Sequence, residues 1–143
     1  MEVTFYILEA ASSTARLRLA CRITEKAYRA GEQVVIWHTD ASELATLDEL
    51  LWTFGDDRSF IPHERFLPGA APQAPVLLSA GTTPPSDVGV LVNLAAEVPE
   101  AASRATRVIE IIDGDPQRRA AGRLRFKTYR DLGWPVVTHQ VQG

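Results

Sequence analysis

Apolar residues along the chain form short continuous runs that alternate with segments of helical periodicity. The run at residues 3–8 is rich in β-branched and aromatic side chains, which favours a strand. Helical spacing follows from possible N-caps at residues 12–14 to Gly31, which suits the left-handed position that ends many helices. The segment at residues 33–37 is apolar after Gln33, as in a strand buried on both faces of a parallel sheet. The chain therefore begins with a predicted β-α-β unit.

The alternation of strands and helices continues to the end of the chain. Asp40 or Ser42 can cap a helix from residue 43 to about residue 52. Later strands are expected at residues 76–79, 88–92, 107–112 and 135–141. The first two of these are interpreted as a strand pair, and residues 53–75 before them as a long loop. We therefore expect residues 1–143 to form a single α/β domain with a mostly parallel open sheet flanked by helices, in a Rossmann-like topology.

Charge and composition exclude several classes of protein. The formal net charge of −3 argues against a protein that coats DNA or RNA with its whole surface. No apolar run approaches the roughly 20 residues of a membrane span, and the N-terminus lacks the pattern of an export signal. A cytoplasmic protein is expected. The single cysteine, Cys21, lies among apolar residues, where a buried thiol is expected rather than a reactive one.

The sequence lacks the local signatures of common catalytic sites. Neither glycine-rich phosphate-binding motif is present, which disfavours a nucleotide enzyme. His38, His63 and His139 lie on different elements without partners at metal-ligand spacing, so we interpret them as structural and expect no cofactor. Asp113 and Asp115 follow a strand and are interpreted as turn and cap residues. The alternative is a metal-dependent nucleotide-processing enzyme in which these two carboxylates hold Mg²⁺.

Basic residues gather in the last helix, which opens at Asp115 and Pro116. Residues 116–130 carry several arginines and one lysine but no acid. At about 100° per residue, the expected core face consists of Ala121, Leu124, Thr128 and Leu132. The opposite, exposed stripe then consists of Arg119, Arg123, Phe126 and Arg130.

This stripe places guanidinium groups beside an aromatic ring. Solvation explains exposed arginines but does not explain an exposed phenylalanine. The combination suits a short acidic peptide that ends in a hydrophobic residue, because planar donor forks can hold its terminal carboxylate. Two alternatives stay open. A rotated helix would tuck Phe126 against the sheet and leave a plain basic face, and nucleic-acid phosphate is a competing anion that the net negative charge disfavours.

A second candidate surface follows the helix predicted at residues 43–52. Trp52, Phe60 and Pro62 bring large apolar side chains to an irregular segment, as interface anchors do. Such residues are equally typical of a lid over the core.

Five segments resemble the chi subunit of bacterial DNA polymerase III in order and spacing, over nearly the full length of the chain. They are residues 4–8 (TFYIL), 27–34 (AYRAGEQV), 47–52 (LDELLW), 59–63 (SFIPH) and 125–133 (RFKTYRDLG). The resemblance implies an α/β fold and no catalytic activity. It also implies a role as an adaptor of the bacterial replicase.

The resemblance implies two kinds of partner. One is the psi subunit, through which chi joins the clamp loader, and a repair helicase competes for the same place. The other is the acidic C-terminal tail of single-stranded DNA-binding protein, which ends in Pro-Phe. Carried over position by position, the tail site falls on Ile112, Arg119, Arg123 and Phe126. The psi and helicase site falls on Trp52, Phe60 and Pro62. No membrane contact and no direct sequence-specific contact with nucleic acid are expected.

Overall fold

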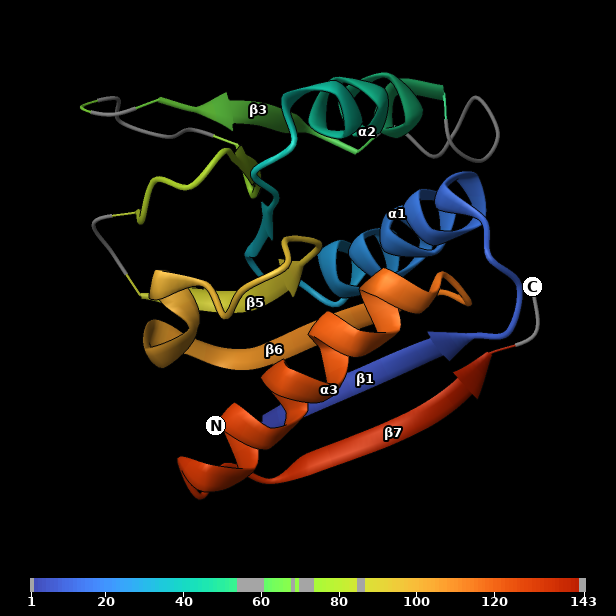
Figure 1. Cartoon of the computed structure of the whole chain (residues 1–143). Coiled ribbons are helices and arrows are strands. Elements are labelled where there is room, and N and C mark those ends of the chain that lie inside the picture. Colours follow the sequence, from blue (N-terminus) through green and yellow to red (C-terminus); the bar gives the residue numbers. More distant parts are fainter. Residues whose placement is uncertain (1, 54–60, 68, 70–73, 85–86, 142–143) are drawn as a thin grey trace.

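An open sheet of parallel strands forms the centre of the described chain (Figure 1). The computed structural model describes residues 2–53, 61–67, 69, 74–84 and 87–141. The strands within these residues are β1 (Glu2–Leu8), β2 (Val34–Trp37), β3 (His63–Phe66), β4 (Val76–Ser79), β5 (Val88–Asn93), β6 (Ala105–Ile112) and β7 (Val136–Val141). They lie in the order β3-β4-β2-β5-β6-β1-β7, and every described pair is parallel. The predicted α/β fold with an open, mostly parallel sheet is confirmed.

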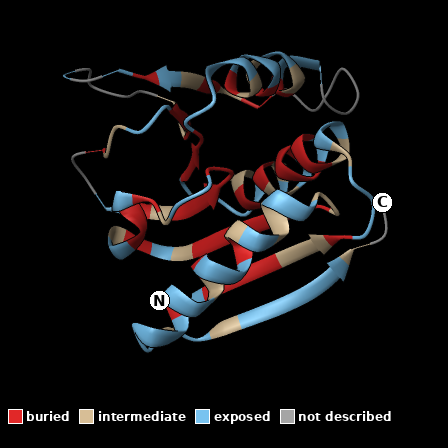
Figure 2. Cartoon of the chain, in the orientation of Figure 1, coloured by how far each residue is buried: buried red, intermediate tan, exposed pale blue. Residues whose placement is uncertain are grey.

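Helices cover both faces of this sheet. Helices α1 (Ser13–Arg29) and α2 (Ala41–Thr53) lie on one face, and helix α3 (Pro116–Asp131) and the short 3-10 helix η1 (Glu100–Arg104) lie on the other. The two faces arise from alternation along each strand, since successive side chains point to opposite sides. Figure 2 shows the consequence: the central strands are largely buried, whereas the edge strand β7 is exposed along most of its length.

Local side-chain hydrogen bonds set the starts of the helices. Ser12 Oγ accepts from the Ala15 N–H at 3.1 Å, and Asp115 Oδ2 accepts from the Arg118 N–H at 2.9 Å. Asp40 Oδ1 likewise accepts from a first-turn N–H of α2 at 3.1 Å. Each of these bonds satisfies a donor that the helix itself leaves unpaired. The helix starts expected at residues 12–14, Asp40 and Asp115 are therefore confirmed.

Two expectations about the strands were wrong. Strands β4 and β5 are not paired with each other, because β2 lies between them and pairs with both. Parallel strands that follow each other in sequence need a crossover and not a tight turn, so sequence proximity was a poor guide to pairing. In addition, strand β3 lies inside the stretch predicted as a loop and pairs with β4. Its sequence, HERF, lacks the β-branched residues that mark most strands.

Among the described residues, no helix combines the length and the apolar character that crossing a lipid bilayer requires.

Candidate functional site

Helix α3 packs on the sheet through a different face from the predicted one. Leu124 and Leu132, which were expected in the core, are 69% and 54% exposed. The buried residues of the helix are Gly122, Arg125 and Tyr129. The predicted core face was wrong because it was chosen by polarity, which left out Arg125 and Tyr129, and the sheet supplies a buried partner for both.

That partner is the carboxylate of Glu110 on β6, which is fully buried. It accepts hydrogen bonds from Arg125 Nε at 3.0 Å, from the Tyr129 hydroxyl at 2.6 Å and from Asn93 Nδ2 at 2.8 Å. Arg125 Nη1 also donates to the Ala96 carbonyl at 2.8 Å. Burial raises the pKa of the Glu110 carboxyl and that of the Tyr129 hydroxyl. The three donors compensate the carboxylate for lost water and hold α3 against β6.

A cavity of about 330 Å³ lies between α3 and the strands β1 and β7, and we call it the α3–β7 pocket. Its lining consists of Phe5, Ile7, Ile112, Arg119, Gly122, Arg123, Phe126, Thr138 and Gln140. All four residues to which the resemblance assigned the tail site belong to this lining. The structure therefore brings the predicted residues together in one concave, partly apolar place.

The floor of the pocket is apolar. Phe126 is half-buried, and its ring lies against Phe5 with the centroids 5.5 Å apart. The exposed stripe had predicted that this ring points outward. It points partly inward instead, because the helix is rotated toward the sheet. One side of the ring still lines the pocket, next to the buried Ile112. Gly122 allows this close approach, because a β-carbon there would overlap Ile112 Cδ1.

Two of the arginines of α3 are neutralised within the chain. Arg125 is paired with Glu110 as described, and Arg118 binds both oxygens of Asp113 at 2.7 Å each. Both acids have no exposed surface. These arginines therefore add structure and little net charge to the surface.

The two arginines that line the pocket keep an uncompensated charge. Among the residues that the structure describes, Arg119 contacts only neutral oxygens: its Nε donates to the Asp113 carbonyl at 3.2 Å and its Nη2 to the Leu8 carbonyl at 3.4 Å. These bonds fix the direction of the guanidinium without cancelling its charge. Arg123 is exposed and makes no ion pair or hydrogen bond within the described part of the chain. The pocket thus offers one oriented and one free cation beside an apolar floor, which is the chemistry that holds an apolar carboxylate.

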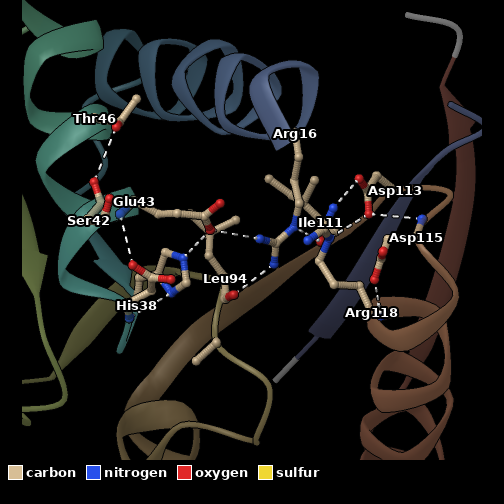
Figure 3. Close-up of polar contacts among 12 residues, drawn as sticks. Arg16, His38, Ser42, Glu43, Thr46, Leu94, Ile111, Asp113, Asp115 and Arg118 are labelled. Atoms are coloured by element: carbon tan, nitrogen blue, oxygen red, sulfur yellow. Dashed lines mark hydrogen bonds and ion pairs between the residues drawn. The ribbon is translucent and has the colours of Figure 1, made fainter. Parts of the chain in front are cut away.

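The carboxylates considered for a metal ion have other roles (Figure 3). Burial alone would raise the pKa of Asp113, but the hydrogen bonds and the charge of Arg118 outweigh it and hold this pKa below its ordinary value. Asp115 is the N-cap of α3. No group of three or more histidine, cysteine, aspartate or glutamate side chains that could hold a metal ion occurs among the described residues. The geometry agrees with the turn and cap roles.

The other titratable groups singled out in the sequence have structural environments. His38 Nε2 lies 2.7 Å from Glu43 Oε1, also visible in Figure 3, and the His139 ring stacks on Tyr6 at 5.6 Å. Cys21 is buried, and burial raises the pKa of its thiol to about 12, so the reactive thiolate is suppressed. The predicted burial of the cysteine is confirmed.

The second candidate surface lies at the end of α2. Trp52 is 56% exposed, and its ring lies 4.7 Å from the ring of His63 on β3. His63 is held from both sides: Nδ1 donates to the Ile61 carbonyl at 2.7 Å, and Nε2 lies 2.8 Å from Asp48 Oδ1. Trp52 is therefore an exposed ring on a fixed support and does not cover the core. Pro62 is half-buried beside His63 in the sequence, and Phe60 lies outside the described residues.

Sequence reasoning missed the strand residues of the α3–β7 pocket. Phe5 and Ile7 from β1 and Thr138 and Gln140 from β7 share one face because alternate residues point the same way. The alternation was visible in the sequence. The pairing of β7 with β1 was not, and only that register brings Thr138 beside Phe5 and Gln140 beside Ile7.

Comparison with known proteins gives one family. The family model described as DNA polymerase III chi subunit, HolC, matches residues 1–137. The DNA polymerase III subunit chi of Pseudomonas aeruginosa is 37% identical over 139 residues, which cover 97% of this chain and 96% of the relative. The protein of the same name from Haemophilus influenzae is 28% identical over 140 residues, with 96% and 95% covered. The chain therefore belongs to the family of DNA polymerase III chi subunits.

Proposed function

We propose that this protein is a non-catalytic adaptor of the bacterial replicase, which links the clamp loader to single-stranded DNA-binding protein. The α3–β7 pocket holds the acidic C-terminal tail of that protein, and the surface around Trp52 holds the psi subunit. One observation carries the proposal: Arg119 and Arg123 line an apolar pocket while no acid of the described chain neutralises them.

The tail and the pocket complement each other in charge and in polarity. A terminal carboxylate needs charge-assisted donors, which the guanidinium groups of Arg119 and Arg123 supply as planar forks. The terminal aromatic side chain needs an apolar contact, which Phe126 and Ile112 supply. Acidic residues upstream meet the basic outer surface of α3, where Lys127 and Arg130 are exposed.

The mechanism of such an adaptor is tethering. A weak contact with one peptide, joined to a rigid assembly, raises the effective concentration of the two partners near each other. This requires no reaction, in agreement with the structural roles of Asp113 and Asp115 described above. Low affinity for a single tail also permits release when the complex moves.

The surface around Trp52 supports the second contact. An exposed tryptophan on a rigid support loses little conformational entropy on binding, and tryptophan is enriched among the residues that dominate interface energies. In this proposal psi binds here, and a repair helicase competes with it for the same residues, with Phe60 and Pro62 contributing.

The experiment that tests the pocket is a titration of a fluorescently labelled tail peptide into the purified chain, followed by anisotropy. Arg123→Ala should weaken binding by about 1–3 kcal/mol, because the peptide carboxylate loses a charge-assisted partner. Arg22→Ala is the matched control, since Arg22 is an exposed residue of α1 on the opposite face. It removes the same charge and should leave the affinity nearly unchanged.

Two results would count against this assignment. One is an equal loss of affinity in the Arg123→Ala and Arg22→Ala variants, which would indicate a general charge effect. The other is unaltered binding of a peptide whose terminal carboxylate is converted to an amide, because the proposed site recognises that group.

A further inference from the structure

One wall of the α3–β7 pocket is formed by neither the arginines nor the aromatic floor. Thr138 and Gln140 lie on β7, which within the described chain pairs only with β1 and forms an edge of the sheet. Their register beside Phe5 and Ile7 directs them to the α3 side, where both line the pocket. Both residues are exposed, and neither side chain has a hydrogen-bond partner in the described chain.

Among the described side chains that line the pocket, these two are the only hydrogen-bond acceptors. The phenylalanine, isoleucine and glycine side chains have no polar atom, and the two arginines can donate but cannot accept. The main-chain carbonyls of β1 and α3 are engaged in the sheet ladders and in the helix. Thr138 Oγ1 and Gln140 Oε1 are therefore the side-chain oxygens available to a donor inside the pocket.

A peptide bound by its carboxyl end brings such a donor with it. The N–H of its last residue lies between the carboxylate, which the arginines hold, and the chain that leads out of the pocket. If this N–H were covered by the apolar floor without an acceptor, binding would lose the hydrogen bond that water had supplied. The guanidinium groups cannot supply a replacement. The wall formed by β7 can.

We propose that Thr138 and Gln140 determine specificity by accepting a hydrogen bond from the main-chain N–H of the last residue of the bound peptide. This inference rests on the proposed function of the α3–β7 pocket and extends it from the end groups of the peptide to its backbone. The pocket then recognises a peptide end as such and discriminates against aromatic acids that lack this N–H.

The test is a double-mutant cycle between the protein and the peptide backbone. The peptide is compared with its ester analogue, in which oxygen replaces the last N–H, on the wild type and on the Thr138→Val/Gln140→Met variant. We expect the ester to bind the wild type about five- to tenfold more weakly, the size of one hydrogen bond. On the double variant the preference for the peptide over the ester should disappear, because the variant offers no acceptor and the N–H that is left unpaired weakens peptide binding.

The control pair is Thr106→Val/Gln117→Met, two exposed positions outside the lining of the pocket. It makes the same chemical changes and should retain the wild-type ratio. The single variants Thr138→Val and Gln140→Met are measured as well, with thermal unfolding as a check on folding. They show which oxygen accepts the bond if the double variant is unstable.

Separate outcomes identify which idea fails. If the wild type binds the peptide and Arg123→Ala weakens it, but the ester ratio is the same in all variants, the role of Thr138 and Gln140 is refuted and the tail site stands. If the wild type binds neither ligand, the proposed function fails and this inference fails with it.

Discussion

Neighbouring residues of α3 have opposite electrostatic roles. Arg118 neutralises the buried Asp113, whereas Arg119, the next residue, is fixed by carbonyl oxygens and keeps its charge for the pocket. A helix turns by about 100° per residue, so adjacent side chains meet different surroundings. The number of arginines in a helix therefore overstates the charge that its surface offers to a partner.

The pairing of Arg118 with Asp113 predicts a dependence of stability on pH. The folded-state pKa of Asp113 lies below its unfolded value of 3.8, so the stabilisation is complete above that value and is lost as pH falls through the folded pKa. Asp113→Asn should lower the free energy of unfolding by about 1–3 kcal/mol near neutral pH, through loss of the charged acceptor. Urea unfolding from about pH 7 to about pH 2 should show this difference shrinking only in the acid range. A constant difference throughout would contradict the assignment.

Gly122 predicts an effect on the pocket that exceeds its effect on stability. A β-carbon at this position would overlap Ile112 Cδ1, so Gly122→Ala should push Ile112 into the space that the peptide ring would occupy in the proposed complex. The gain in helix propensity, about 1 kcal/mol, offsets part of the strain. We expect at least a fivefold loss of peptide affinity, about 1 kcal/mol by the usual conversion, with a change of only a few degrees in Tm. Ala121→Gly, one position away and outside the pocket lining, is the reciprocal control.

At the scale of elements, the sequence predicts which strands and helices form, but it does not always predict which face of an element is buried. Apart from β3, the described strands and the three helices are indicated by apolar runs, caps and helical spacing, because these signals are local. The buried face of α3 is not local information. Arg125 and Tyr129 point inward only because Glu110, fifteen and nineteen positions earlier, offers a buried acceptor. A prediction based on residue polarity alone therefore assigns the wrong face of α3 to the core.

The same limit applies to the candidate site. Ile112, Arg119, Arg123 and Phe126 were predicted through resemblance to a family, and the structure places them in one pocket. The wall from β7 depends on the pairing of two strands that lie at opposite ends of the chain. No local pattern contains that pairing.

The Glu110 cluster predicts a large cost for one buried substitution. Glu110→Ala leaves the buried guanidinium of Arg125 without its anion, and removal of one partner from a buried pair costs about 3–5 kcal/mol. Glu32→Ala is the matched control. It breaks a pair of similar length with Arg107 that is more than one third exposed, where about 0–1 kcal/mol is expected. Denaturant unfolding of the two variants measures the difference, and equal costs would mean that the cluster does not hold α3.

At the scale of the whole molecule, the two candidate surfaces lie at opposite ends of the sheet. Trp52 contacts His63 on β3, one edge strand, whereas the α3–β7 pocket adjoins β7, the other edge strand (Figure 1). Six strand spacings of about 4.8 Å separate these edges by roughly 30 Å. They also lie on different faces, since α2 and α3 cover opposite sides. The two proposed partners would therefore have room to bind at once.

This separation predicts that the two contacts are independent. The tail peptide should bind the free chain and a chain saturated with psi with affinities that agree within about twofold, because coupling between sites requires an element whose state both ligands change. Trp52→Ala should reduce capture of psi and leave the peptide affinity unchanged, and an Arg119→Ala/Arg123→Ala double variant should do the reverse. Anisotropy with labelled peptide, with and without psi, measures the first effect and pull-down with tagged psi the second. Loss of peptide binding on addition of psi would show that the surfaces overlap or are coupled, and an adaptor that holds only one partner at a time cannot tether the two together.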